Sequence, residues 1–270
     1  MPELPDLEVF QQNLLTQVKN KTIVETGCNA VKALTASTPE ELNRISQGQQ
    51  FTNISRRGKH LIFHISNDSK LILHLMLRGR LEYGSILKEH ALSDCFWFQF
   101  NDGNELRIID QTSWIKLEVI KDGNLQNSKL LSKLGPEADE IDLEKFSKIL
   151  KASRLGRIKP LLMDQKKLAG IGNAYADEIL WKSKINPGRS ASLLTDNEIK
   201  TLHLNIQKVL SWGIDNNKKE AHGKLAESRR EWMNIYRKKG KPCPECGTLI
   251  EYTKVNQRDT FYCPKCQKSK

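Results

Sequence analysis

The chain has 270 residues, of which 38% are hydrophobic and 28% are charged, so it is long enough for one large or two medium domains with buried cores. No apolar run reaches the length of a membrane span, and the first residues lack the pattern of a signal peptide, so we expect neither a membrane protein nor a secreted one. A net charge of +11, from 43 Lys and Arg against 32 Asp and Glu, favours a nucleic acid as partner.

The N-terminal half is predicted to be one helix followed by a sheet. Residues 4–18 place apolar side chains at near-helical spacing, from Leu4 and Leu7 to Val18. Between about 22 and 122 the chain consists of short segments rich in β-branched and aromatic residues, separated by turn residues such as "SNDSK" and "NDGNE". We expect a mostly antiparallel sheet, folded into a sandwich or a barrel.

The period becomes helical after the linker-like segment "KLGPEADEIDLEKF", and four helical segments are predicted between 142 and about 213. Gly170 and Gly172 mark a tight turn between two of them, with Asp164 and Asn173 as residues near the helix ends. Such a turn lets the backbone approach a phosphate, but many helix pairs turn on glycine and the motif alone is weak. Residues 214–242 are polar and basic.

Four of the six cysteines form two C-x2-C pairs near the C-terminus, a spacing that predicts a closed tetrahedral zinc site with a structural role. The predicted ligands are Cys243, Cys246, Cys263 and Cys266. The isolated Cys28 and Cys95 are expected to be buried core thiols. Arg258 lies between the two pairs, near the tip of the predicted hairpin, where it is either a phosphate contact or an ordinary solvated charge.

The chain begins "MPELPDLEVF". Removal of Met1 would leave Pro2 as a free secondary amine, and an α-amino group titrates at about 7.7–8.0, so part of it is neutral and nucleophilic near pH 7. The ordinary interpretation is a proline in the first turn of the helix that follows.

Together these features resemble the formamidopyrimidine-DNA glycosylase / endonuclease VIII family of base-excision repair enzymes. The matching segments follow the family order and cover almost the whole chain. They are "PELP" at 2–5, "RRGKHL" at 56–61, "HLMLRGRL" at 74–81, "IKPLLMDQ" at 158–165, "GIGNAYADEIL" at 170–180 and "FYCPKCQ" at 261–267.

The resemblance implies an α+β fold: an N-terminal antiparallel β-sandwich with flanking helices, then a helix–two-turns–helix domain with a four-cysteine zinc ribbon. We place the three domains at residues 1–130, 131–238 and 239–270. It also implies damaged DNA as partner, bound in a cleft between two lobes with the damaged nucleotide flipped out. One structural Zn²⁺, no catalytic metal and a monomer are expected.

The implied chemistry uses Pro2 as nucleophile at C1′ of the deoxyribose, followed by β- or β,δ-elimination of the flanking phosphates. Glu3 matches the carboxylate that protonates the opening sugar ring. Asp6 stands where the family usually has glutamate, so its shorter reach is in question. Glu178 matches a glutamate near the active site, with an exposed helix position as the alternative.

The implied phosphate contacts are Lys59, which is also counted with the catalytic residues, Asn173 and Arg258. Lys159 is a weaker candidate for the same role. For Lys59 the ordinary alternative is an exposed lysine at the edge of a sheet.

Two departures concern the flipped-out lesion. Leu77 takes the place of the residue that fills the vacated stack, but the family's "DPRRFG"-like stretch reads "DQTSWI" and lacks the arginine. Trp114 stands near the position of the aromatic wedge, or is a tryptophan of the sheet core. Without the arginine, we expect either a loose choice of the opposite base or tolerance of single-stranded and open structures. The short, basic stretch 214–232 weakens an assignment to 8-oxoguanine and leaves formamidopyrimidines, oxidised pyrimidines and bulkier adducts open.

Three functions are compatible with these observations. The first is a bifunctional DNA glycosylase and abasic-site lyase, favoured by Pro2, Glu3 and Lys59. The second is a damaged-DNA or junction-binding protein of the same fold with weak or lost glycosylase activity. The third is a ribosome- or RNA-associated zinc-ribbon protein, which accounts for the charge and the cysteines but not for the N-terminus. We expect a cytoplasmic, nucleoid-associated protein, with a nuclear or organellar location left open.

Overall fold

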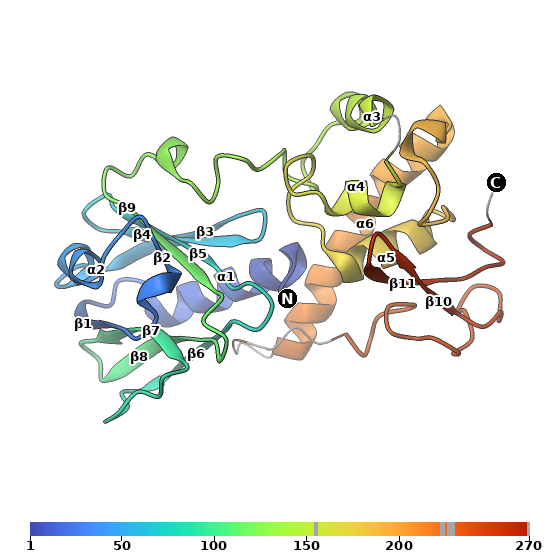
Figure 1. Ribbon diagram of the computed structural model, residues 1–270. Helices are drawn as coiled ribbons and strands as arrows, with labels where there is room; N and C mark the ends of the chain where they lie inside the picture. The colour runs from blue at the N-terminus through green and yellow to red at the C-terminus, as the bar shows by residue number, and fades with distance from the viewer. Residues whose placement is uncertain (154–155, 222–224, 226–229, 269–270) are drawn as a thin grey trace. The chain divides into compact units, whose positions relative to one another are not determined.

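The computed structural model describes residues 1–153, 156–221, 225 and 230–268 (Figure 1). The chain divides into two compact units, and the main change from the first to the second falls between Lys133 and Leu134. Residues Glu3–Pro5 belong to the second unit although they lie near the N-terminus, and the end of the longest helix from Asn217 belongs to the first. No helix in the described ranges is long and apolar enough to span a membrane.

The first unit contains two β-sheets with two α-helices packed on them (Figure 1). Its helices are α1 (Leu4–Val18), η1 (Val31–Ala33), α2 (Pro39–Ser46) and η2 (Leu125–Asn127). Its strands are β1 (Ile23–Cys28), β2 (Leu34–Thr35), β3 (Phe51–Arg57), β4 (His60–Ile65), β5 (Lys70–His74), β6 (Arg80–Ser85), β7 (Asp94–Phe100), β8 (Asn104–Ile109) and β9 (Lys116–Ile120).

The strands form the two layers of a β-sandwich, as predicted. One sheet has four antiparallel strands in the order β1-β7-β8-β6, and the other has five in the order β2-β9-β5-β4-β3. The pairing of β2 with β9 is parallel, and the named strand pairs around it are antiparallel. The expected segments between 22 and 122 therefore become strands because their apolar side chains face a shared interior.

Aromatic side chains from both sheets meet in that interior. The Phe51 ring lies 5.2 Å from Phe63 in its own sheet and 5.4 Å from Phe98 in the other, with centroids in the range of favourable tilted and edge contacts. Cys95 is fully buried beside this core, as expected, whereas Cys28 is only half-buried.

Sequence patterning missed α2, which interrupts the region predicted as sheet. Thr38 caps its N-terminus by accepting a hydrogen bond from the Glu41 amide at 3.2 Å, and Pro39 occupies the first turn. The signal was present in "STPEEL", because a capping threonine followed by proline and glutamates is typical of a helix start.

The second unit consists of four α-helices and a β-hairpin in the described part of the chain. Its elements are α3 (Leu143–Ala152), α4 (Ile158–Met163), α5 (Asn173–Lys182), η3 (Ala191–Leu193), α6 (Asp196–Ala221), β10 (Glu251–Val255) and β11 (Arg258–Tyr262). All four predicted helical segments are present. The last is longer than predicted: α6 continues through residues 214–221, a segment of polar and basic composition.

Candidate functional site

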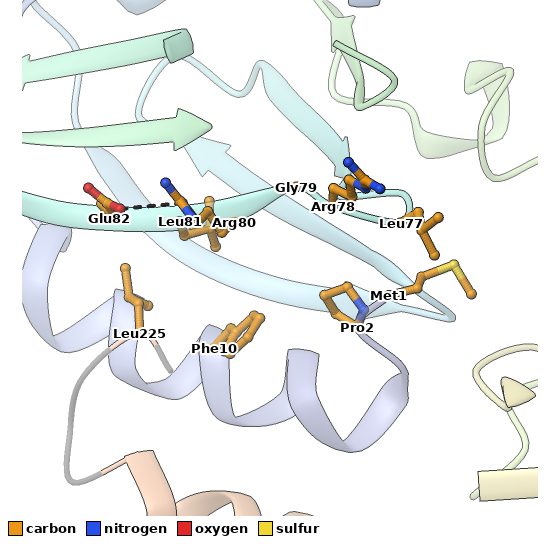
Figure 2. A pocket seen from close by; sticks show the side chains of 10 residues that line it. All are labelled: Met1, Pro2, Phe10, Leu77, Arg78, Gly79, Arg80, Leu81, Glu82 and Leu225. Carbon is orange, nitrogen blue, oxygen red and sulfur yellow. Dashed lines mark ion pairs between the residues drawn. The ribbon is translucent and has the colours of Figure 1, made fainter. Parts of the chain in front are cut away.

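A pocket of about 380 Å³ opens beside the N-terminus in the first unit (Figure 2). The side chain of Pro2 is buried at one end of it and that of Met1 is 44% exposed. The remaining lining comes from Phe10, Leu225 and the stretch from Leu77 to Glu82. The nitrogen of Pro2 carries Met1 here, so loss of Met1 would expose this nitrogen at the pocket wall.

Glu3 lies in the second unit, where its carboxylate caps the start of α5. It accepts hydrogen bonds from the amides of Gly172 at 2.7 Å, Ala174 at 3.0 Å and Tyr175 at 3.3 Å. A Cβ atom at position 172 would lie 2.4 Å from the Glu3 carboxyl carbon, so glycine is needed there for this approach. The helix N-terminus favours the negative charge and fixes the position of the carboxylate.

Asp6 is 1% exposed and accepts a hydrogen bond from the Asn217 side chain at 3.2 Å. Asn217 lies near the end of α6, far away in sequence but in the same unit. The shorter carboxylate of Asp6 is therefore hydrogen-bonded despite its reduced reach. Asn217 is a residue that the sequence pattern does not indicate.

Lys59 follows a left-handed glycine, Gly58 with φ 54°, in the turn between β3 and β4, and its side chain is 5% exposed. The alternative interpretation of Lys59 as an exposed lysine at the edge of a sheet is therefore wrong. His60 on β4 and His74 on β5 lie on neighbouring strands of the same sheet, with ring centroids 4.6 Å apart. The pKa of His60 is lowered to about 3 and that of His74 to about 4, chiefly by burial, and the charge of Lys59 contributes to both shifts.

Leu77 stands on a tight turn between β5 and β6 and is 57% exposed. The turn closes through a hydrogen bond from the Gly79 amide to the Leu75 carbonyl at 2.9 Å. Met76 adopts φ 52° in it, and its amide donates to Nδ1 of His74 at 2.9 Å. Neutral His74 therefore holds the base of the turn that presents Leu77.

Trp114 is 58% exposed, so its alternative interpretation as a core tryptophan is wrong. The buried carboxylate of Asp110 holds its loop, accepting hydrogen bonds from the amides of Thr112, Trp114 and Ile115 at 2.8–3.1 Å and from the Thr112 hydroxyl at 2.7 Å. Burial opposes ionisation, but these hydrogen bonds outweigh it and lower the pKa of Asp110. Asp110 was not singled out from the sequence, although Asx-turn chemistry could have indicated it.

Asn173 is the first residue of α5, and Gly172 is the N-cap, so the capping expected near Asn173 is supplied by Glu3 instead. The Asn173 side chain donates from Nδ2 to the Asp259 carbonyl at 3.0 Å. Asp164 ends α4 and accepts from the Lys166 amide at 3.0 Å.

Arg258 begins β11 directly after a two-residue turn in which Asn256 and Gln257 have φ of 47° and 62°. Two left-handed residues are the geometry of a type I′ hairpin turn. The side chain of Arg258 is exposed and forms no ion pair with any residue in the described part of the chain.

The four predicted zinc ligands come together below this hairpin, with all sulfur atoms within 4.8 Å of one another. Cys243 and Cys266 are 4.0 Å apart and Cys246 and Cys263 are 3.4 Å apart. Tetrahedral Zn²⁺ with Zn–S bonds of about 2.3 Å requires sulfur separations of about 3.8 Å, so the donor set fits the ion. Four protein ligands close the coordination sphere and leave no position for a substrate.

Glu178 and Lys159 are both inside the second unit. Glu178 is 1% exposed and accepts hydrogen bonds from the amides of Ile235 and Tyr236 and from the Asn234 side chain at 2.8–3.0 Å, so the exposed-helix alternative is wrong. Burial raises the pKa of Glu178, and these donors act in the opposite direction. Lys159 has no exposed surface and lies 2.7 Å from Asp177.

The structure thus gathers the predicted residues in two groups. Pro2, Asp6, Lys59, Leu77 and Trp114 belong to the first unit. The second group is Glu3, Asn173, Lys159, Glu178 and Arg258. The stretch predicted at 214–232 begins as helix, and its residues 222–224 and 226–229 lie outside the described residues.

Comparison with known proteins gives matches along nearly the whole chain. Residues 1–116 match the formamidopyrimidine-DNA glycosylase N-terminal domain, residues 134–224 the H2TH domain of the same enzymes, and residues 240–268 a zinc finger found in FPG and IleRS. A formamidopyrimidine-DNA glycosylase from Ligilactobacillus salivarius is 36% identical over 279 residues, which cover 99% of each chain.

Two solved structures of Lactococcus lactis Fpg are similar over 99% of this chain and 100% of theirs. One is a complex with DNA that contains an abasic site and the other a complex with DNA that contains Fapy-dG, each with a TM-score of 0.90 and 30% identity. These matches exclude the ribosome-associated alternative. The chain belongs to the formamidopyrimidine-DNA glycosylase family and is a zinc-finger DNA repair enzyme of bacterial type, a glycosylase and abasic-site lyase.

Proposed function

We propose that the chain excises damaged bases through a covalent bond between the Pro2 nitrogen and C1′ of the deoxyribose. The observation that carries the proposal is the pocket beside Pro2, whose side chain is buried at one end of it. Because Pro2 is buried and lies in a basic protein, its free amine would be held largely in the neutral, nucleophilic form.

The first proposed step is attack of the Pro2 amine on C1′ of the damaged nucleotide. The amine lone pair forms the N–C1′ bond, the bond from C1′ to the damaged base breaks, and the base leaves with a proton from water. The Glu3 carboxylate takes the proton from the new N–C1′ ammonium group and gives it to O4′ as the sugar ring opens, so that C1′–O4′ breaks, an iminium ion remains and Glu3 is again a carboxylate. This cation acidifies C2′, and loss of a proton from C2′ expels the 3′ phosphate. Loss of a proton from C4′ of the resulting conjugated iminium then expels the 5′ phosphate.

Lys59, Asn173 and Arg258 are proposed to bind the phosphates around the lesion, and the exposed position of Arg258 supports this role most directly. Leu77 and Trp114 are proposed to fill the stack that the flipped nucleotide leaves. Their exposed fractions of 57% and 58% are unusual for large apolar side chains. Each lies on a turn that a backbone hydrogen bond to a side chain stabilises, to His74 for the Leu77 turn and to Asp110 for the Trp114 turn.

Asp6 and Glu178 are proposed to act through other groups and not on the substrate. The Asp6 carboxylate is bonded to Asn217, and that of Glu178 to the segment Asn234–Tyr236. Each is 1% exposed and, unlike Glu3, neither is next to Pro2 in the chain, which supports a positioning role.

Formamidopyrimidines are the proposed lesion class, supported by the names of the similar enzymes and by the Fapy-dG complex among the similar structures. Choice of the opposite base is proposed to be loose. Thr112 and Ser113 stand where the "DPRRFG"-like stretch has its two arginines. The Thr112 hydroxyl donates a hydrogen bond to Asp110, and neither side chain offers a base the paired N–H donors of an arginine. A cytoplasmic location is proposed because the similar enzymes are bacterial.

The test is reduction with sodium borohydride in the presence of a duplex with one abasic site. The expected product is a covalent adduct whose mass equals DNA plus protein without Met1. Protein that retains Met1 should form no adduct, and Pro2→Gly should form it more slowly because a primary amine replaces the secondary one. Pro39→Ala, at a proline in the first turn of α2, is the matched control and should trap like the wild type.

Equal trapping by protein that retains Met1 would overturn the assignment of Pro2. A reversible gel shift with no adduct, on any abasic or oxidised substrate, single- or double-stranded, would instead support the damaged-DNA-binding alternative. A panel of oligonucleotides with single lesions then separates formamidopyrimidines from 8-oxoguanine and oxidised pyrimidines by excision rate.

A further inference from the structure

The side chain of Lys159, which the sequence suggested as a phosphate contact, is directed into the protein. Its ammonium group lies 2.7 Å from Asp177 Oδ1 and donates hydrogen bonds to the Asp259 carbonyl at 2.7 Å and to the Thr260 hydroxyl at 2.8 Å. The side chains of Lys159 and Asp177 are both 0% exposed. A phosphate cannot approach this group without displacing the hairpin that covers it.

The two hairpin residues that Lys159 contacts, Asp259 and Thr260, directly follow Arg258 in the chain. The Thr260 hydroxyl donates to the Arg258 carbonyl at 2.9 Å, and the Phe261 amide donates to Asp177 Oδ2 at 3.1 Å. The Asn173 side chain reaches the same Asp259 carbonyl as Lys159 does. Helices α4 and α5 therefore hold the first residues of β11 at several points, while the Arg258 side chain stays exposed.

A buried ion pair is a poor means of adding stability. Two charges removed from water lose their hydration, and well-packed apolar residues in their place are often as stable or more stable. Burial raises the pKa of Asp177 to about 7 and lowers the pKa of Lys159, which expresses the same penalty. A buried charged pair does fix the relative positions of the segments that carry it, because its polar contacts are made in one arrangement only.

We infer that Lys159 is a positioning residue, which with Asp177 fixes the hairpin tip so that Arg258 is presented to a DNA phosphate, and that Lys159 does not contact DNA itself. The inference rests on the proposed phosphate contact of Arg258. The sequence suggested that Lys159 contacts DNA directly. In this inference Lys159 acts on DNA binding only indirectly, by holding the β-hairpin that carries Arg258.

The test compares the salt dependence of binding to abasic-site DNA for Lys159→Met, Arg258→Ala and the double variant. Each phosphate contact contributes about 0.9 to the slope of log affinity against log salt concentration. For each single variant we expect the slope to decrease by about 0.9, which corresponds to one phosphate contact fewer. For the double variant we expect the same decrease of about 0.9, and not twice that value. A loss of about two in the double variant would show that Lys159 is a separate phosphate contact and would overturn the inference, as would an unchanged slope for Lys159→Met.

Lys148→Met is the matched control, because Lys148 is an exposed lysine on α3 paired with Glu144. It should leave the slope unchanged. Zinc content and thermal melting identify variants that have lost the fold. The double variant Lys159→Met, Asp177→Leu removes both charges. It should be at least as stable as Asp177→Asn, which leaves the Lys159 charge buried without its ionised partner. Its salt slope should nevertheless stay reduced, because methionine cannot donate to the Asp259 carbonyl and the Thr260 hydroxyl. Recovery of the full slope in this charge-free variant would contradict a positioning role.

Amide hydrogen exchange in the free protein gives a readout that does not depend on DNA. Lys159→Met should speed exchange of the Phe261 amide at least tenfold, since the acceptor Asp177 loses its partner. The Gly240 amide, bonded to the Ile250 carbonyl at 2.9 Å in the same module, should exchange as in the wild type. If Arg258→Ala alone leaves the slope unchanged, the proposed phosphate contact fails, and the exchange result still decides whether Lys159 holds the hairpin. Unchanged exchange at Phe261 would refute the inference.

Discussion

In both units, exposed candidate residues lie on turns that hydrogen bonds from other residues hold in place. The two units differ in how far apart in the sequence the bonded residues are. In the first unit Leu77 and Trp114 stand on turns held by His74 and Asp110, and these contacts join residues two to five positions apart. In the second unit the hairpin tip with Arg258 is held by Lys159 across 100 positions.

The same contrast extends to the charged groups around α5. Glu3 reaches the Gly172 amide across 169 positions, and Glu178 reaches the Ile235 amide across 57. A local contact forms as soon as its turn forms, whereas a long-range contact requires the whole unit to be assembled. The second unit should therefore depend more strongly on its metal and on single buried charges than the first.

Loss of zinc should have the largest effect and should separate the two units. Structural zinc contributes on the order of 10 kcal/mol to small zinc modules, so Cys263→Ser should abolish zinc binding and unfold the hairpin with its contacts to Lys159. The β-sandwich should remain folded. Zinc content and amide exchange in each unit measure this. Cys28→Ser, at a half-buried thiol of the first unit, is the control and should keep its zinc. A sandwich that unfolds with the zinc module would contradict the contrast.

Removal of the Glu178 charge should destabilise the second unit by about 2–3 kcal/mol, because Glu178→Gln leaves buried amides with a weaker acceptor. Unfolding by urea, followed separately in each unit, measures the loss. Glu144→Gln removes a carboxylate that is 78% exposed and should change stability by less than about 0.5 kcal/mol. Similar losses in the two variants would show that burial of Glu178 has no special importance.

The buried histidines should make the first unit sensitive to acid. Their pKa values in the folded state, about 3 for His60 and about 4 for His74, lie below the usual 6.5. The unfolded chain therefore binds more protons below pH 6.5, and stability should fall as the pH falls from 6.5 toward 4, by about 1.4 kcal/mol per pH unit for each histidine. Urea titrations between pH 7.5 and 4.5 measure the slope. His74→Asn should reduce it, and an unchanged slope would argue against a neutral His74 under the Leu77 turn.

Truncation of Leu77 should have the smallest effect on stability and a clear effect on activity. Leu77→Ala removes an exposed side chain, so the free energy of unfolding should change by less than about 0.5 kcal/mol. Excision from duplex DNA should slow, because the proposed wedge is lost, while abasic single strands are affected less. Leu92→Ala, at a leucine that is 88% exposed in the same unit, is the matched control. Equal excision rates for the two variants would remove Leu77 from the proposed site.

Much of the fold could be predicted from the sequence because its signals are local. The strands between 22 and 122 follow from alternating β-branched and aromatic residues, and the zinc site follows from the spacing of Cys243, Cys246, Cys263 and Cys266. The helix α2 was missed even though its capping threonine and proline are local signals as well. The end of α6 was missed because its polar composition hides a helix that is stabilised by packing.

The sequence by itself determined the family and the zinc ligands. Only the tertiary structure decided that Trp114 is exposed, that Lys159 and Glu178 are buried, and that Glu3 caps α5. The reason is physical. Exposure and partnership of a charged side chain depend on residues that approach from distant parts of the chain, and such approaches leave no period or spacing in the neighbouring sequence.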